Sequence, residues 1–257
     1  MTIEPHEAPN LSGQIALVTG SAHNIGRAIA LAFAHAGADV VVHARTSKDE
    51  LDAVVTEARN AGVRSVGLLG DVRDHGDVAH VVDEARRELG PITVLVNSAA
   101  VRPEGPFEQM TFEEWREVHA TIVDGAFLCT RAVIGDMLGQ GRGTIINIAG
   151  LTAHTGAPMR AHVVSAKAAL IGFTKALALE YGGRGITVNG ISPGLIEADP
   201  RPGQAPRPEP AHRRDRVVPV GRMGKPRDVA AMCCYLASQH ARYITGQVFS
   251  VNGGTYL

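Results

Sequence analysis

The segment QIALVTGSAHNIG, residues 14–26, joins a short apolar run to a turn of small residues, after which a helical pattern begins. Such a turn lets the backbone come close to a pyrophosphate, and the following helix N-terminus offers free N–H groups and a positive dipole end. Asn24 stands where a third glycine is common, and asparagine tolerates left-handed backbone angles. We therefore expect a dinucleotide-binding loop rather than a purely structural turn. Its expected contacts are Gly20, Ser21, His23, Asn24, Ile25 and Gly26.

The rest of the chain alternates apolar runs with helical patterns. The runs are mostly β-branched and lack polar alternation, as strands covered on both faces do. We expect strands at 14–19, 39–43, 64–69, 92–97, 144–148, 186–191 and 247–251. We expect helices at 25–36, 47–61, 74–89, 111–138, 157–182 and 226–238. This alternation predicts an α/β fold with a doubly wound parallel sheet of about seven strands and helices on both faces.

The composition excludes several classes of protein. The 257 residues are 45% hydrophobic and 20% charged, which suits a single folded domain over 1–257 and not a disordered or fibrous chain. A net charge of −1 argues against nucleic acid or an anionic membrane as the main partner. The 3 cysteines form no metal-ligand spacing, so we expect reduced thiols and no metal site. With no run of about 18 apolar residues, we expect a soluble cytoplasmic protein.

One segment departs from the alternation. Residues 197–216, EADPRPGQAPRPEPAHRRDR, hold five prolines and five arginines but no apolar run, so they cannot form a core element. A long insertion without regular structure in a compact domain is either disordered or functional. Since it follows soon after an expected strand, we predict a substrate lid over 197–216, with a neutral surface loop as the alternative.

The end of the second expected strand distinguishes NAD(H) from NADP(H). A carboxylate there would hydrogen-bond the ribose 2′-hydroxyl and repel a 2′-phosphate. The chain instead has Ala44 at that place, and the adjacent Arg45 can form a charge-assisted fork with a phosphate. Thr46, Ser47 and His23 could add hydrogen bonds. We expect NADP(H), with Arg45 and Thr46 among its contacts, and NAD(H) as the alternative.

Several further segments occur together in this chain. They are TGSAHNIG (19–26), GDV (70–72), NSAA (97–100), GTIINI (143–148), KAALIGFTKALALE (167–180), GITVNGISPG (185–194) and YITGQVFSVNGG (243–254). Together they resemble the short-chain dehydrogenase/reductase family, in its classical size group, over nearly the whole chain. The resemblance implies a Rossmann-type fold, a nicotinamide coenzyme, a small-molecule substrate and a homotetramer built on the long helices. The coenzyme contacts implied by position are Asp71, Val72, Asn97, Ala99, Lys167, Pro193, Gly194 and Ile196.

The catalytic half departs from this family. Its members typically use a serine, a tyrosine four residues before a lysine, and an asparagine on the long central helix. Lys167 is present, but Val163 stands at the tyrosine position, Gly150 at the serine position and Ile122 at the asparagine position. Carbonyl reduction needs a proton on oxygen, and a positioned acid is worth about 10²–10⁴ in rate. The chain therefore has a degenerate Ser/Tyr/Asn set and needs another proton donor for this chemistry.

Histidines near the expected cleft are the candidates for that donor. His154 lies on the loop after the fifth strand, which in this family faces the substrate, and His162 adjoins the tyrosine position. Each can donate a proton near neutral pH. We expect Lys167, His154 and His162 to be catalytic, with His154 as the first choice of donor. Arg102 and Arg160 could bind an acidic substrate, although we expect both to be solvated.

Three functions remain open. The first is an NADP(H)-dependent oxidoreductase acting on a carbonyl/alcohol pair with a non-standard proton donor, in which Lys167 binds the nicotinamide ribose. The second is an NADP(H)-binding sensor or partner subunit without turnover, which an apolar, well-packed catalytic cleft would favour. The third is non-redox lyase or hydrolase chemistry, in which Lys167 with a lowered pKa, or a histidine, acts as base or nucleophile.

Overall fold

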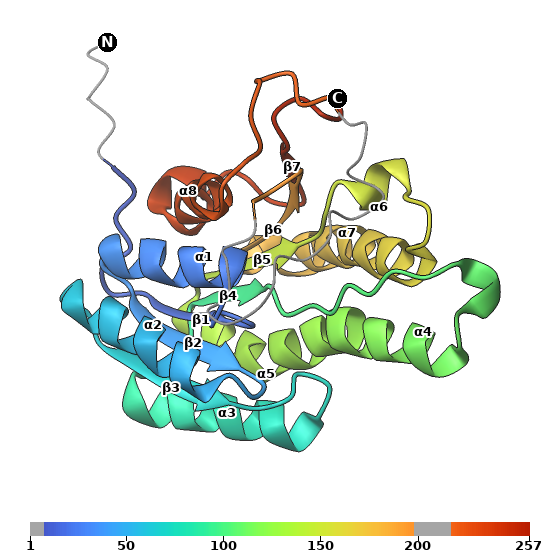
Figure 1. The fold of residues 1–257 in the computed structure, drawn as a ribbon. Helices are drawn as coiled ribbons and strands as arrows, with labels where there is room; N and C mark the ends of the chain where they lie inside the picture. Colours follow the sequence, from blue (N-terminus) through green and yellow to red (C-terminus); the bar gives the residue numbers. More distant parts are fainter. Residues whose placement is uncertain (1–7, 198–216) are drawn as a thin grey trace, which may run out of the picture.

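A seven-stranded parallel sheet forms the centre of the molecule (Figure 1). The computed structural model describes residues 8–197 and 217–257. The strand order is β3-β2-β1-β4-β5-β6-β7, and every neighbouring pair is parallel. The order of winding reverses at β1, which pairs with both β2 and β4, and ligands bind such sheets at the strand carboxyl ends beside that point. The strands are β1 (Ile15–Val18), β2 (Asp39–Ala44), β3 (Ser65–Leu69), β4 (Val94–Asn97), β5 (Gly143–Ile148), β6 (Ile186–Pro193) and β7 (Val248–Val251).

Helices connect the strands, as the sequence predicts. They are α1 (Asn24–His35), α2 (Lys48–Asn60), α3 (His75–Glu88), α4 (Phe112–His119), α5 (Gly125–Gln140), α6 (Thr152–Thr155), α7 (Ala161–Tyr181) and α8 (Pro226–Ala237). Local side chains fix several of their starts. The Asp74 carboxylate caps α3 by accepting a hydrogen bond from the Asp77 N–H, and Thr111 and Glu114 form a capping box at α4. The predicted Rossmann-type α/β fold is confirmed.

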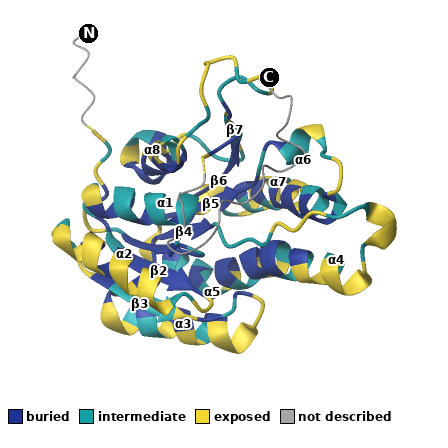
Figure 2. Ribbon diagram, viewed as in Figure 1, coloured by how far each residue is buried: buried dark blue, intermediate teal, exposed yellow. Residues whose placement is uncertain are grey.

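The helices cover both faces of the sheet and enclose two apolar cores (Figure 2). On one face, α1, α2 and α8 pack against strand residues such as Val18 and Val40. On the other face, α3, α5 and α7 pack against the intervening strand residues, such as Leu17 and Val41. Because both faces are covered, successive strand residues are buried, and this explains the continuous apolar runs in the sequence.

The helix expected over 111–138 is interrupted in its middle. Between α4 and α5 lies a π-helical turn, η2 (Ala120–Asp124), and such turns are rare and frequent at functional sites. Ile122 lies in this turn and packs with Val163 of α7 in a third apolar cluster. The buried members of this cluster are Val118, Ile122, Ala126, Val163, Ala166 and Leu170.

The helix expected over 157–182 starts later than predicted, at Ala161. Two residues before it, Met159 has φ of +60°, a left-handed conformation that residues other than glycine rarely adopt. Arg160 occupies the N-cap position of α7 without a side-chain capping hydrogen bond, and the preceding chain forms the short α6, which is not expected from the sequence. The predicted lid, 197–216, lies outside the described residues apart from Glu197.

Two helical segments, Phe112–Gln140 and Ala161–Arg184, are long and apolar enough to cross a membrane by length and composition alone. Within the fold, α5 packs against β4 and β5, and α7 packs against β5 and β6. Their apolar residues are therefore accounted for in part by contact with the sheet, and the two segments are weak support for a membrane span.

Candidate coenzyme-binding and active site

The loop between β1 and α1 has the geometry of a narrow cradle. Gly20 has φ of +66° and Asn24 has φ of +48°, so both adopt the left-handed conformation, as the sequence predicts for Asn24. A Cβ added to Gly26 would lie 2.3 Å from the Gly20 carbonyl oxygen, and one added to Gly20 would lie 3.0 Å from the Ala99 Cα. Only glycine fits at either position, and the resulting close backbone approach at the start of α1 fits a dinucleotide pyrophosphate.

His43, in β2, supports this loop by hydrogen bonds. Its Nδ1 accepts a hydrogen bond from the Gly20 N–H at 3.3 Å, and its carbonyl accepts one from the Ser21 N–H at 2.8 Å. Burial lowers the pKa of His43 from 6.5 to about 4, so the imidazole is neutral at pH 7. Thr19 supports the neighbouring loop after β4 in the same way, since its Oγ1 accepts hydrogen bonds from the N–H groups of Ser98 and Ala99. Sequence reasoning missed both supports because each lies in or beside an apolar run without a motif.

The ends of β2 and β3 carry the groups expected at the adenosine end of the coenzyme. Arg45 and Thr46 are exposed directly after β2, and the His23 Nε2 lies 3.3 Å from the Ser47 Oγ. Hydrogen bonds from Arg73, with a smaller effect of the Arg45 charge, hold the pKa of the Asp71 carboxyl below its usual value. Val72, next along the chain, is buried against α5 at Gly125. Arg45 and Asp71 are thus close enough to interact at one edge of the site.

Asn97, at the end of β4, begins a buried chain of side-chain hydrogen bonds. Its Nδ2 donates to the Asn147 Oδ1 at 2.9 Å and to the Thr130 Oγ1 at 3.2 Å. The Asn147 Nδ2 in turn donates to the Thr174 Oγ1 at 2.9 Å. The Asn97 Oδ1 is buried and has no partner among the described residues. This polar chain ties β4 and β5 to α5 and α7.

The turn after β6 brings the last predicted coenzyme contacts to the same edge of the sheet. A Cβ added to Gly194 would lie 2.6 Å from the Asn252 Cα, so the chain after β7 packs directly on this turn. The Leu151 N–H donates to the Pro193 carbonyl at 3.0 Å, and Ile196 forms a parallel bridge with Gly224. The loops after β5, β6 and β7 therefore meet at the carboxyl ends of the strands.

His154 lies within this group of loops, in α6. Its Nε2 is 2.9 Å from the Oγ of Ser192, the residue before Pro193, and its ring stacks on Tyr256 with centroids 5.4 Å apart. The side chain is half-buried. Of the two histidines predicted as donors, His154 is therefore the one beside the predicted nicotinamide contacts. No motif pointed to Ser192 as its partner.

His162 faces a different neighbourhood, between α7 and α4. It is 2% exposed, and its Nδ1 has no hydrogen-bond partner among the described residues. Burial lowers its pKa, with smaller effects from Arg160, Glu114 and His119. The nearby Ser165 Oγ lies 3.2 Å from the His119 Nε2. Two of these charged neighbours belong to α4, which places His162 on the flank of α7.

Lys167 is buried in α7 and donates its Nζ to the Ile148 carbonyl at the end of β5. Burial, together with repulsion from the charges of Arg102 and Arg160, lowers its pKa from 10.5 to about 7. Arg102 is exposed, as expected, but the expectation that Arg160 is solvated is wrong, because Arg160 is only 7% exposed. It is turned inward at the start of α7, close enough to Lys167 for their charges to interact.

The three residues expected at the catalytic asparagine, serine and tyrosine positions have different surroundings. Ile122 and Val163 are each 2% exposed and share the apolar cluster between η2 and α7. Gly150, after β5, borders open space, since a Cβ added there meets no atom within 4 Å. Ile122 and Val163 are thus packed aliphatic side chains, while a side chain at position 150 would have room.

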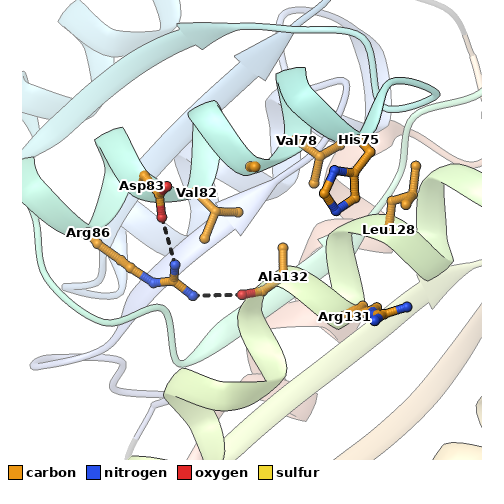
Figure 3. Close-up of a pocket in the computed structure, with 9 residues that line it drawn as sticks. His75, Val78, Val82, Asp83, Arg86, Leu128, Arg131 and Ala132 are labelled. Carbon is orange, nitrogen blue, oxygen red and sulfur yellow. Dashed lines mark hydrogen bonds and ion pairs between the residues drawn. The ribbon is translucent and has the colours of Figure 1, made fainter.

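Two surface pockets lie elsewhere. One, of about 210 Å³, lies between α3 and α5, where Arg86 donates to the Asp83 carboxylate and to the Ala132 carbonyl (Figure 3). The other, of about 380 Å³, lies beside Arg64 and the start of β3. None of the predicted site residues lines either pocket, so both are separate from the candidate site. Within 8–197 and 217–257 no group of three metal-ligating side chains occurs.

Comparison with known proteins gives one consistent result. Residues 20–256 match the family model described as enoyl-(acyl carrier protein) reductase. The chain is 38% identical to a 3-oxoacyl-[acyl-carrier-protein] reductase of Staphylococcus epidermidis over 94% of this chain and 98% of that protein. The corresponding Escherichia coli reductase is 37% identical over 96% of this chain and 99% of its own length.

Solved structures agree. A Sinorhizobium meliloti structure covers 97% of this chain and 98% of its own, with a TM-score of 0.88 and 33% identity. A short-chain type dehydrogenase/reductase from Mycobacterium marinum covers 96% of each chain, with a TM-score of 0.84 and 34% identity. The chain therefore belongs to the short-chain dehydrogenase/reductase family of oxidoreductases.

Proposed function

We propose that this protein is an NADP(H)-dependent oxidoreductase that interconverts a carbonyl and an alcohol, with His154 as the proton donor. The observation that carries the proposal is the glycine cradle at Gly20 and Gly26, which admits no side chain and opens at the N-terminus of α1. Lys167 on α7 and the turn at Pro193 lie at the same carboxyl ends of the strands, since Lys167 donates to the Ile148 carbonyl and Pro193 ends β6. Family membership supports the redox chemistry and the coenzyme.

The exposed Arg45 favours NADP(H) over NAD(H). No carboxylate stands at the end of β2, where Ala44 is buried, and the Arg45 guanidinium is accessible to a 2′-phosphate. Thr46 and Ser47 offer hydroxyls beside it. An arginine in this place stabilises the phosphorylated coenzyme by a charge-assisted hydrogen bond that the ribose hydroxyl of NAD(H) does not make.

Individual residues of this chain would transfer the proton and hold the coenzyme. A nicotinamide coenzyme held in this site would supply the hydride for reduction of the carbonyl carbon. His154 donates the proton to the carbonyl oxygen, oriented by its hydrogen bond to Ser192 and its stacking on Tyr256. Lys167 is the residue that we propose to bind the nicotinamide ribose. In the reverse direction His154 accepts the proton from the alcohol.

The family also supplies the wider expectations. The curated relatives are named for reduction of a 3-oxoacyl group on acyl carrier protein, so 3-oxoacyl compounds are the first substrates to test. We propose a cytoplasmic homotetramer built on the long helices. Light scattering on the purified protein tests the assembly.

The experiment that tests the function is NADPH oxidation by the purified protein with a panel of 3-oxoacyl compounds, ketones and aldehydes. His154→Gln should lower kcat by about 10²–10⁴ with little change in NADPH affinity. His80→Gln, which changes an exposed histidine on α3, is the matched control and should keep full activity. Arg45→Gln should lower the preference for NADPH over NADH roughly ten- to hundredfold.

A second candidate function is coenzyme binding without turnover. The observation that favours it is the packing of Ile122 and Val163 into an apolar cluster where the family has catalytic polar groups. In that case NADPH binds but is not oxidised with any carbonyl of the panel, and His154→Gln changes nothing. Turnover without coenzyme that Lys167→Ala abolishes would instead indicate non-redox chemistry.

A further inference from the structure

The contact between His154 and Ser192 determines which nitrogen of the His154 ring is left for a ligand. Ser192 is the next-to-last residue of β6 and is 1% exposed, and its Oγ lies 2.9 Å from the His154 Nε2. Ser192 lies four residues after Val188, which belongs to the apolar core on the α7 face of the sheet. Because side chains alternate along a strand, Ser192 lies on that same face.

The backbone holds the histidine against this serine. The Leu151 N–H donates to the Pro193 carbonyl at 3.0 Å, and the His154 N–H donates to the Leu151 carbonyl at 3.0 Å, so α6 is attached to the end of β6. Tyr256 stacks on the ring with an angle of 22° between the two planes. The Asn252 Nδ2 donates to the Tyr256 carbonyl at 2.8 Å and fixes the chain after β7. Three separate segments therefore position the imidazole.

The burial of the Ser192 hydroxyl places the hydrogen of the neutral ring. A buried hydroxyl needs an acceptor for its hydrogen, and within the described ranges the His154 Nε2 is the only hydrogen-bond partner of the Ser192 Oγ. The hydroxyl therefore donates to Nε2. A neutral imidazole carries a single N–H hydrogen, which is then on Nδ1. The opposite tautomer would leave the buried hydroxyl hydrogen without an acceptor.

The Nδ1 of His154 is the nitrogen that a ligand can reach. It makes no hydrogen bond with any other described residue, and it is not among the buried atoms that lack a partner in that part of the chain. It is therefore open to solvent. Nε2 stays occupied in both protonation states of the ring, because a hydroxyl donates to a bare nitrogen and accepts from an N–H.

We propose that Ser192 is a positioning residue that occupies the Nε2 of His154, so that Nδ1 is the atom that hydrogen-bonds the substrate carbonyl and transfers the proton. This inference rests on the proposed function for the reacting carbonyl. In reduction the ring begins protonated on both nitrogens. Its Nδ1–H bond breaks as the O–H bond of the alcohol forms, and hydride from the nicotinamide coenzyme makes the new C–H bond. The neutral ring then regains a proton from solvent at Nδ1.

Nitrogen-15 NMR of the histidine rings tests the assignment in the resting protein. The sample is the full chain with labelled histidine at about pH 9, where histidine rings are neutral, and His154→Gln identifies the His154 signals by their loss. A protonated and a bare ring nitrogen have well separated shifts. We expect the Nδ1–H tautomer of His154 to exceed the Nε2–H tautomer roughly tenfold in the wild type. Ser192→Ala should remove this excess.

Turnover gives a second measurement. Ser192→Ala should lower kcat for carbonyl reduction roughly tenfold and leave the KM for NADPH unchanged, and Ser192→Thr, which keeps the hydroxyl, should restore most of the rate. The control is Ser65→Ala, since Ser65 is a buried serine of β3 whose Oγ donates to the Val40 carbonyl at 2.9 Å. This control should change neither the His154 tautomer nor kcat.

The outcomes separate this inference from the proposed function. An excess of the Nε2–H tautomer in the wild type, or a tautomer that Ser192→Ala leaves unchanged, would overturn the role of Ser192 while carbonyl reduction could still stand. A fall in kcat no larger than that of Ser65→Ala would also overturn it. An Nδ1–H excess that Ser192→Ala removes, in a protein that oxidises NADPH with no carbonyl of the panel, would support the hold on the ring and contradict the proposed function.

Discussion

Lys167→Met should remove a pH dependence from the stability of the protein. The lysine is buried, and burial together with the charges of Arg102 and Arg160 lowers its pKa from 10.5 to about 7. In the unfolded chain the amine titrates at its ordinary value, so between these two pH values only the unfolded state binds the proton. The unfolding free energy of the wild type therefore falls as the pH decreases through this window, and this loss stops below about pH 7.

The magnitude follows from the displacement of the pKa. One unit of displacement corresponds to about 1.4 kcal/mol, so the wild type should lose about 3 kcal/mol between about pH 9.5 and about pH 7. Methionine is similar in length to the aliphatic part of lysine but binds no proton, and the variant should not show this loss. The missing hydrogen bond to the Ile148 carbonyl lowers the stability of the variant by an amount that changes little with pH.

Urea unfolding of the coenzyme-free protein at several pH values measures the difference. The free energy of Lys167→Met relative to wild type should rise as the pH is lowered from about 9.5 to about 7. Lys175→Met, at an exposed position of the same helix, is the control and should follow the wild type. If the difference between Lys167→Met and wild type is constant over this range, Lys167 keeps an ordinary pKa and the reasoning about its surroundings is wrong.

Three further substitutions test other parts of the structure. Gly26→Ala should lower the free energy of unfolding by about 1–3 kcal/mol and weaken NADPH binding, because the new Cβ would lie 2.3 Å from the Gly20 carbonyl oxygen. Gly135→Ala, in open space on α5, should instead raise the free energy of unfolding by about 0.5–1 kcal/mol. The wild type should lose about 2 kcal/mol of unfolding free energy between about pH 7 and about pH 5, because only the unfolded histidine binds a proton there. His43→Gln should abolish this loss, and urea unfolding at both pH values checks it. Gly150→Ser should change stability by less than about 0.5 kcal/mol and raise the rate of carbonyl reduction, and an unchanged rate would show that this position does not face the carbonyl.

Much of the fold could be predicted from the sequence because its signals are local. Unbroken β-branched runs mark strands covered on both faces, and the alternation with helical patterns leaves a parallel sheet as the natural arrangement. The left-handed Asn24 is also a local matter, since asparagine tolerates that conformation at a position where glycine is common. By contrast, the π-helical turn η2 gives no pattern of its own, because one extra residue in a turn leaves the apolar periodicity almost unchanged.

The candidate site was predictable in its nucleotide half and less so in its catalytic half. Glycines indicate a close backbone approach by their residue type alone. The surroundings of a polar side chain depend instead on elements that are distant in the sequence. The sequence predicts only that His43 belongs to a strand, and yet its side chain supports the glycine loop. Arg160 is expected from the sequence to be a solvated surface residue, yet in the fold it is buried at the start of α7, beside the left-handed Met159. The packing of Ile122 against Val163 likewise requires both helices to be in place.

The buried chain from Asn97 through Asn147 to Thr174 has a consequence for spectroscopy. Hydrogen bonds in series polarise one another, so a group that donates to the Asn97 Oδ1 changes the electron density at each following amide and hydroxyl. If a ligand donates to this oxygen, the side-chain amide resonances of Asn97 and Asn147 should both shift. The same two resonances should respond to a displacement of α7 at Thr174, without any label attached to the surface.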